Sequence, residues 1–226
     1  MRQHCGSRSR LLDGVARFLF AFGMVATGAA PAHANFLYAS YSVLNDQNVV
    51  VDFNSGPKTG SESGGSGRIT LNGLTDNGIS EGPLTTWCVD IYDDLASRGS
   101  FTALTSYAST DPLYGKIDAV IANRTPLLGG NTYASAAVQI AIWELEYGSA
   151  VTIHAGAAVE TLAATFVANV TSGTWQADPG TEVWVLSESG NQSQAYLGNV
   201  AEPSGLAVLG IGLLGLGAVA IRRSLV

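Results

Sequence analysis

The order of hydrophobic patterns along the middle of the chain is the feature that most constrains its fold. Short runs rich in β-branched and aromatic residues, which predict strands, occupy 36–44, 48–53, 68–74, 84–95, 181–189 and 193–198. Between the fourth and the fifth run, apolar residues recur at helical spacing in three segments, at about 111–121, 133–148 and 157–170. Because one group of helices interrupts the strands, we expect an α+β domain. It would be mainly an antiparallel sheet or sandwich with a helical insertion of about three helices, and its closing strands would pair with its opening ones.

Turn and cap residues support this division. Asp111 is a suitable cap for the first helix, and Gly148 a suitable end for the second. The sequence NDQ at 45–47 predicts a turn between the first two strands. The Gly/Ser-rich segment 56–67 predicts a mobile loop, and it lacks the GxxxxGK[ST] order of a phosphate-binding loop.

Residues 1–34 have the three parts of a secretory signal. Four arginines precede an apolar run at 18–25, which is too short to span a bilayer. Ala32 and Ala34 then form an A-x-A cleavage pattern. We expect cleavage after Ala34, and the alternative is a buried N-terminal helix of the fold.

The C-terminal segment 201–226 has the composition of a membrane anchor. Its residues 205–221 carry no charge, and Arg222 and Arg223 follow them. A helix of this length rises about 25 Å, at the short end for a transmembrane span. The two arginines would hold the C-terminus on the cytoplasmic side. An ordinary single-span anchor has the same composition.

The motif before this segment adds a more specific resemblance. Ala201, Glu202 and Pro203 precede the apolar segment, and the whole tail resembles the PEP-CTERM sorting signal of Gram-negative bacteria that produce exopolysaccharide. In that family an exosortase recognises Pro-Glu-Pro and removes the helix; here Ala201 replaces the first proline. The resemblance implies an exosortase-type partner and transient anchoring in the inner membrane. Release to the cell surface or to an exopolysaccharide matrix would follow.

Removal of both ends would leave one domain, at about residues 35–200. The whole chain has 11 Lys+Arg against 18 Asp+Glu, and six of the 11 basic residues lie in the end segments. The remaining domain is therefore more acidic than the whole chain, whose net charge is −7. Such a surface repels phosphate backbones, so we expect no nucleic-acid partner.

The sequence predicts neither a metal site nor a cofactor. His154 is the one histidine of the expected domain, and one histidine with one cysteine does not make a zinc site. Asp90, Asp93 and Asp94 lack the spacing of a calcium loop.

Cys88 is the residue that most needs an explanation. The only other cysteine, Cys5, would leave with the signal segment, so an exported domain would carry one thiol. Strand alternation puts Cys88 on the same face as Asp90 and Tyr92, opposite the apolar face of Trp87. That position is unusual for a cysteine that only fills space.

Two short motifs within 84–147 resemble those of bacterial thioester domains, which occur in surface adhesins. In that family, the cysteine of a [YFW]-C-[VI]-[DE] strand bonds covalently to the glutamine of a TQxA-[IV]-W helix. This chain has WCVD at 87–90 and VQIAIW at 138–143, and related segments recur among PEP-CTERM proteins. By motif, the matching residues are Cys88, Gln139, Ala141 and Trp143. Val138 replaces the threonine, and the separation of the motifs is compact beside that of the adhesins.

The resemblance implies an internal thioester between Cys88 and Gln139. An amine on another surface would attack it and become attached to Gln139. Each molecule would react once, so the protein would not be a turnover enzyme. Trp87 and Trp143 could exclude water from the bond, and Asp90 or Tyr92 could assist proton transfer.

Three other interpretations of Cys88 stay open. The thiol can simply be packed, with Gln139 bonded to a backbone carbonyl, in a non-catalytic matrix or biofilm structural protein. It can form an intermolecular disulfide outside the cell. It can also be the nucleophile of a cysteine hydrolase that uses His154 as its base.

Overall fold

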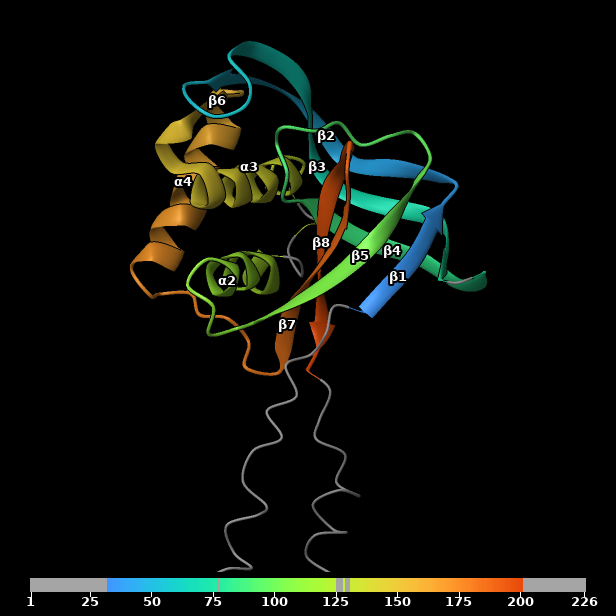
Figure 1. Cartoon of the computed structure of the whole chain (residues 1–226). Coiled ribbons are helices and arrows are strands. Elements are labelled where there is room, and N and C mark those ends of the chain that lie inside the picture. Colours follow the sequence, from blue (N-terminus) through green and yellow to red (C-terminus); the bar gives the residue numbers. More distant parts are fainter. Residues whose placement is uncertain (1–31, 77, 125–127, 129–130, 201–226) are drawn as a thin grey trace, which may run out of the picture. The chain divides into compact units, whose positions relative to one another are not determined.

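The computed structural model describes residues 32–76, 78–124, 128 and 131–200, whose strands and helices occupy opposite sides in Figure 1. The sorting segment 201–226, including the apolar residues 205–221, lies outside the described residues, as does the signal segment up to residue 31. Within the described ranges, no helix is both long enough and apolar enough to cross a membrane.

The described elements follow the expected order of strands, helices and strands. The strands are β1 (Ala32–Tyr38), β2 (Ser40–Phe53), β3 (Gly60–Asp76), β4 (Ile79–Cys88), β5 (Gly99–Ala108), β6 (Val151–His154), β7 (Thr181–Glu188) and β8 (Asn191–Asn199). The helices are α2 (Tyr114–Arg124), α3 (Ala134–Tyr147), the short 3-10 helix η2 (Gly148–Ala150) and α4 (Ala157–Thr171). The α+β class is therefore confirmed.

The strands form one sheet in the order β1-β5-β7-β8-β4-β3-β2-β6. The long strand β3 pairs with β2 and β4, and its last residues also pair with β1 through Phe36 opposite Asp76. This extra pairing closes six strands into a barrel-like ring, with β2 and β6 continuing from β3. The ring, rather than a sandwich of two separate sheets, is the finer architecture. Removal of residues up to Ala34 would leave the described β1–β3 register intact.

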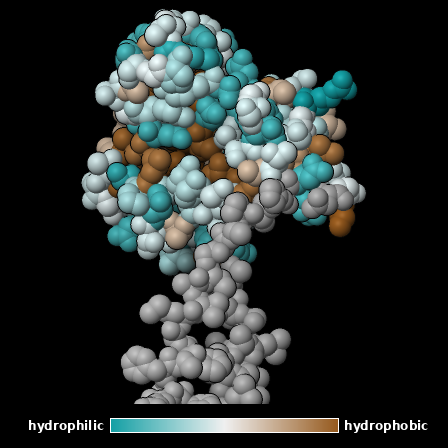
Figure 2. Space-filling view, in the orientation of Figure 1, coloured by the Kyte–Doolittle hydropathy of each residue, from teal (hydrophilic) through white to brown (hydrophobic). Residues whose placement is uncertain are grey.

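Helix α3 is the central helix of the fold. Its first ten residues are buried, from Ala134 to Trp143, because its sequence is apolar around its whole circumference. It packs against α2 and α4 on one side and against β3 on the other. Figure 1 shows α2, α3 and α4 gathered beside the strands. Figure 2 shows apolar residues in a recessed band between α3 and α2, while the outer surface is mostly polar.

The helix boundaries follow the predicted caps. Asp111 Oδ1 accepts hydrogen bonds from the backbone N–H groups of Leu113 and Tyr114, at 2.9 and 2.8 Å. Gly148 ends α3 with a φ of +50°, and its N–H donates to the carbonyl oxygen of Glu144. All three predicted helices are therefore confirmed.

Two predictions about the first strands are wrong. The chain breaks at Ala39 instead of at 45–47, where β2 continues through a bulge with Asn45 at a φ of +51°. The Gly/Ser segment is a loop only up to residue 59. From Gly60 onward it is the first half of β3 and pairs with β2, because backbone hydrogen bonds need no side chains.

The sequence patterns also missed strands β5 and β6, and they extended β4 too far. The expected strand at 84–95 ends at Cys88, and 89–95 follows without strand pairing. The expected pairing of closing with opening strands is confirmed only in part: β7 pairs with β5, which the sequence did not predict, whereas β8 pairs with β4. The second of these pairings forms the environment of Cys88.

Candidate functional site

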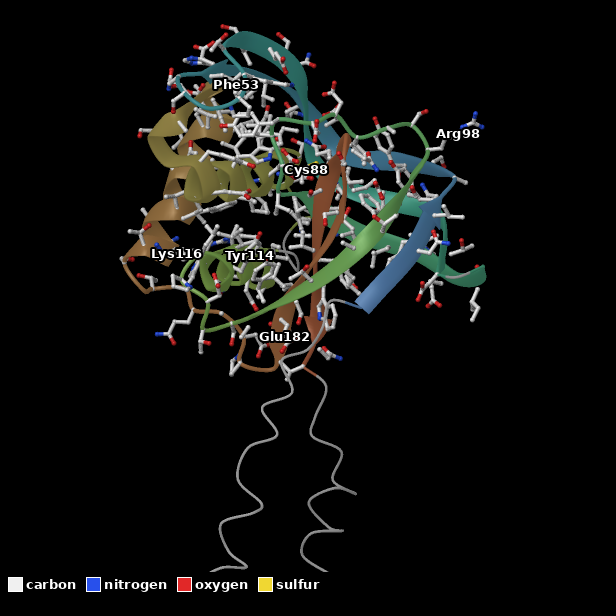
Figure 3. The ribbon with its side chains drawn as sticks, in the orientation of Figure 1. Phe53, Cys88, Arg98, Tyr114, Lys116 and Glu182 are labelled. Atoms are coloured by element: carbon white, nitrogen blue, oxygen red, sulfur yellow. The ribbon has the colours of Figure 1, made fainter. Side chains whose placement is uncertain are left out.

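Cys88 is the last residue of β4, at the point where β4 pairs with β8. Gln194 of β8 lies directly opposite, and Trp87 lies opposite Ala195. The cysteine is only 4% exposed, because the strand end is buried on both faces. Figure 3 shows Cys88 between the strands and α3. The expected polar side of the strand is therefore inside the molecule.

Gln139 lies on α3 and is 1% exposed. Its carboxamide makes two hydrogen bonds with the backbone of Cys88, although 51 residues separate the two positions. The Cys88 N–H donates to Gln139 Oε1 at 2.9 Å, and Gln139 Nε2 donates to the Cys88 carbonyl oxygen at 2.7 Å. The carboxamide thus continues the ladder like a residue of a neighbouring strand. The two sequence motifs meet at this point.

The sulfur atom lies between two glutamine side chains of β8. The Cys88 thiol donates to Gln192 Oε1 at 2.7 Å, and Gln194 Nε2 donates to the sulfur at 3.2 Å. Gln192 is held by the carbonyl oxygen of Asp90, and Gln194 by the hydroxyl of Thr86. The alternation QSQ puts the two glutamines on one face of their strand, but the sequence does not reveal that β8 pairs with β4.

Burial raises the pKa of the Cys88 thiol to about 12. The hydrogen bond from Gln194 opposes this rise, and the charge of Asp90 adds to it. The thiol is therefore protonated at neutral pH, as its donation to Gln192 requires. In the unreacted protein, only a very small fraction of molecules carries the nucleophilic thiolate.

The other motif residues are buried around this pair. Trp87 is 1% exposed, Ala141 is fully buried and Trp143 is 4% exposed. The indole Nε1 of Trp143 is a buried donor that has no hydrogen-bond partner in the described part of the chain. Such a donor is uncommon inside proteins and can serve an acceptor atom that arrives later.

A cleft of about 410 Å³ opens beside these residues. Cys88, Gln139, Trp143 and Gln192 line it, together with residues of β2, β3 and the segment after β4. The pair is thus buried but adjoins a space that a small molecule or a side chain can enter.

Asp90 and Tyr92 make other contacts than those expected of proton-transfer groups. Asp90 Oδ1 accepts the backbone N–H of Tyr92 at 2.9 Å. The Tyr92 hydroxyl donates to the carbonyl oxygen of Ser55 at 3.4 Å. Both therefore organise the segment after β4, and the hydrogen bonds of the Cys88 sulfur run to β8 instead.

His154 is the last residue of β6. Its Nε2 lies 2.9 Å from Asp52 Oδ2, and its side chain is 56% exposed. A hydrogen bond from Ser61 and the one with His154 hold the pKa of Asp52 below its usual value. These contacts pair His154 with an aspartate of β2, whereas Cys88 contacts glutamines.

Glu146 is a further group near the site that the sequence did not single out. Burial and, to a smaller extent, the charge of Asp90 raise the pKa of its carboxyl to about 8. Its Oε2 is buried without a hydrogen-bond partner among the described residues. No sequence signal distinguishes Glu146 from the solvent-exposed glutamates that commonly end a helix.

No protein-family model, curated protein or solved structure matches the chain. The resemblances to thioester domains and to PEP-CTERM proteins therefore depend on the sequence motifs alone. In the described part of the chain, no three His, Cys, Asp or Glu side chains are grouped to hold a metal ion.

Proposed function

We propose that this is an exported surface or matrix protein in which Cys88 and Gln139 form an internal thioester that captures an amine. The observation that carries the proposal is the pair of hydrogen bonds between the Gln139 carboxamide and the Cys88 backbone, at 2.9 and 2.7 Å. They hold the acyl donor next to the residue that bears the nucleophile.

The proposed reaction balances without a cofactor. The Cys88 sulfur attacks Cδ of Gln139, and the C–N bond breaks. The nitrogen leaves as ammonia and takes the thiol proton. An amine then attacks the thioester carbon, a new amide bond forms as the C–S bond breaks, and a proton of the amine goes to the sulfur. Enforced proximity of this kind can contribute about 7–11 kcal/mol to the first step.

One contact supports activation of the carboxamide. The Cys88 N–H already donates to Gln139 Oε1, the oxygen that becomes negative when sulfur attacks. A donor fixed at that position stabilises the developing charge. The unpartnered Nε1 of Trp143, on the wall of the same cleft, is a second candidate donor.

The high pKa of the thiol opposes the reaction and makes it slow. Below the pKa of about 12, each increase of one pH unit raises the thiolate fraction of Cys88 about tenfold. We therefore expect the thioester to form slowly after folding, and faster in alkaline than in neutral buffer.

The intact mass of the purified protein tests the proposal. A thioester makes the chain one ammonia lighter, and methylamine should restore mass as an adduct on Gln139. Cys88→Ala and Gln139→Ala should each remove the mass deficit. Gln194→Ala is the control: it leaves both reacting residues in the chain, so the deficit should persist. A free thiol at full mass, in protein kept at alkaline pH, would rule the thioester out.

A second candidate is a structural matrix protein without covalent chemistry. It is favoured by the fact that both Gln139 hydrogen bonds run to the backbone and give each polar atom of the buried amide a partner. In that case Gln139 joins α3 to the end of β4, and Cys88 is a packed thiol. The same mass measurement separates the two candidates.

Export and sorting belong to the same proposal. The end segments support cleavage after Ala34, anchoring through 205–221, and processing by an exosortase-type enzyme at 201–203. An exopolysaccharide matrix is the proposed destination. Ala201→Pro would restore the family motif, so in a host with an exosortase it should increase release of the chain from the membrane. Equal membrane retention of both forms would contradict the sorting assignment.

A further inference from the structure

We propose that the cleft beside Cys88 binds an alkylamine that carries a second positive charge, such as a linear polyamine or a lysine side chain in a basic segment. The binding step does not need the thioester, so it can be tested separately. Where the thioester forms, the same site would bring the amine to Gln139, and that part of the inference rests on the proposed function.

The walls of the cleft suit an alkyl chain. Val49, Val51 and Phe53 of β2 form one side and are each at most 6% exposed, and Ile91 and Leu95 contribute from the segment after β4. Methylene groups can pack against these side chains and leave water.

Glycines of β3 keep the space open. Gly64 pairs with Val49, so a side chain at position 64 would stand on the same face as Val49. A Cβ on Gly64 would meet no atom within 4 Å, whereas one on Gly65 would collide with the carboxylate of Asp46. The Gly/Ser segment is thus a strand whose missing side chains leave room for a ligand.

The rim of the cleft is acidic. Four carboxylates line it, and they come from three different segments of the chain: Asp46, Glu62, Asp93 and Asp94. Lone acidic residues on a surface are ordinary, but here they line a cleft whose walls also carry buried apolar side chains. Charge and shape together therefore favour a cation with an aliphatic body over a sugar or an anion.

The chain already holds one ammonium at this rim. Lys58 Nζ lies 2.8 Å from Glu62 Oε2 and 5.6 Å from the centre of the Phe53 ring. The hydrogen bond to Glu62 raises the pKa of Lys58, and the charges of Asp94 and Asp93 add to the rise. The contacts of Lys58 thus show that the rim stabilises an alkylammonium group. The other three carboxylates remain for a ligand.

The deep end of the cleft is uncharged. Gln139 and Gln192 present amide groups there, and Cys88 presents a neutral thiol. A ligand with two amines can keep one charged at the rim and hydrogen-bond the other to the amide groups at the deep end. A monoamine makes only one of these contacts, so the second amine should increase affinity.

Calorimetric titration of the Cys88→Ala form of the whole protein tests this inference without covalent chemistry. Cadaverine and spermidine should bind saturably, more tightly than butylamine, and more weakly as salt increases. A lysine-containing basic peptide and its acetylated form distinguish a protein-borne amine from a free polyamine. The peptide should bind only when its lysines are not acetylated.

Substitutions at the rim provide the specific test. Asp93→Asn with Asp94→Asn should weaken cadaverine binding about tenfold, as expected for loss of two partly exposed charge contacts. Glu182→Gln is the matched control, because Glu182 lies at the end of the molecule opposite Phe53 in Figure 3. Gly64→Leu should block the cleft, whereas Gly64→Ala should leave binding intact.

The inference fails if no saturable binding occurs, or if the rim variant and the Glu182→Gln control bind equally. It also fails if butylamine binds as tightly as cadaverine. A mass deficit in the wild-type protein together with any of these results would leave the thioester standing and remove only the polyamine site. Binding without a mass deficit would do the reverse.

Discussion

At the scale of single residues, Gln139 joins the two halves of the site. Its amide is buried on α3, and both of its polar atoms bond to the backbone of Cys88. A buried carboxamide with this arrangement needs one acceptor atom and one donor atom in fixed positions. The sulfur itself contacts the side chains of Gln192 and Gln194, so three glutamines surround one cysteine. Static packing requires only these contacts, whereas a thioester also requires the sulfur to approach the carboxamide carbon of Gln139.

The dependence on Gln139 can be measured apart from any thioester. In a Cys88→Ala background, Gln139→Glu should lower the free energy of unfolding by about 2–3 kcal/mol at neutral pH. The new carboxylate would be buried and would face the Cys88 carbonyl oxygen without a hydrogen to donate. Urea denaturation measures the change. Gln176→Glu, on an exposed side chain, is the matched control and should change stability little. Equal effects of both substitutions would mean that the Gln139 bonds do not support the fold.

At the scale of elements, β3 combines three tasks in one strand. Its glycine-rich first half pairs with β2 and lines the cleft. Its middle joins α3, where the Ser66 hydroxyl donates to the carbonyl oxygen of Ala136, and the Arg68 N–H donates to Ser135 Oγ. Its last residues close the ring with β1. Among the strands, β3 therefore contributes most to the position of the helix that carries Gln139.

The close contact of β3 with its neighbours predicts different effects for two glycines. A Cβ on Gly67 would lie 2.8 Å from the carbonyl oxygen of Leu44 and 3.2 Å from Ser135 Oγ, so β2 or α3 would have to move. Gly67→Ala should therefore destabilise the protein by about 1–3 kcal/mol. Gly64→Ala, in the same strand with open space, should cost less than about 0.5 kcal/mol. Thermal or urea unfolding of both variants checks this, and equal stability would contradict the packing of β3 on α3.

At the scale of the whole molecule, buried carboxyls determine how stability changes with pH. Burial raises the pKa of Glu146 to about 8, and it also raises the pKa values of Glu144 and Asp118. A group whose pKa is higher in the folded state binds more protons when folded. Folding is therefore favoured at low pH and loses stability as pH rises from the unfolded pKa, near 4.5 for a glutamate, towards 8. Cys88 adds a further loss above pH 9, its unperturbed value.

This pattern predicts a protein that is more stable near pH 5 than near pH 8. Glu146→Gln removes the ionisation of that side chain, so it should raise stability at pH 8 by about 2 kcal/mol and change it little at pH 5. Glu81→Gln, at an exposed position, is the control for a general effect of charge. Urea midpoints at the two pH values measure both. A stability that rises from pH 5 to pH 8 would show that the carboxyl of Glu146 ionises normally.

The class of fold and the positions of the helices could be predicted from local sequence patterns. Apolar periodicity and the cap residues Asp111 and Gly148 act within a single segment of the chain. The helices α2, α3 and α4 could therefore be predicted from short segments. The cysteine and glutamine motifs were visible for the same reason, since each is a short local pattern. The terminal segments were also interpreted from local composition, and their predicted roles stay predictions.

Which segments lie next to each other depends on long-range contacts that no local pattern reveals. From Gly60 onward, the Gly/Ser segment is a strand because its backbone pairs with β2. Its small side chains give no sign of this pairing in the sequence. The pairing of β4 with β8 brings Gln192 and Gln194 to a sulfur more than 100 residues away along the chain. Burial, which is a property of the assembled molecule, raised the pKa values of Cys88 and Glu146. Local sequence therefore specified the candidate residues, and long-range contacts gave them their chemical surroundings.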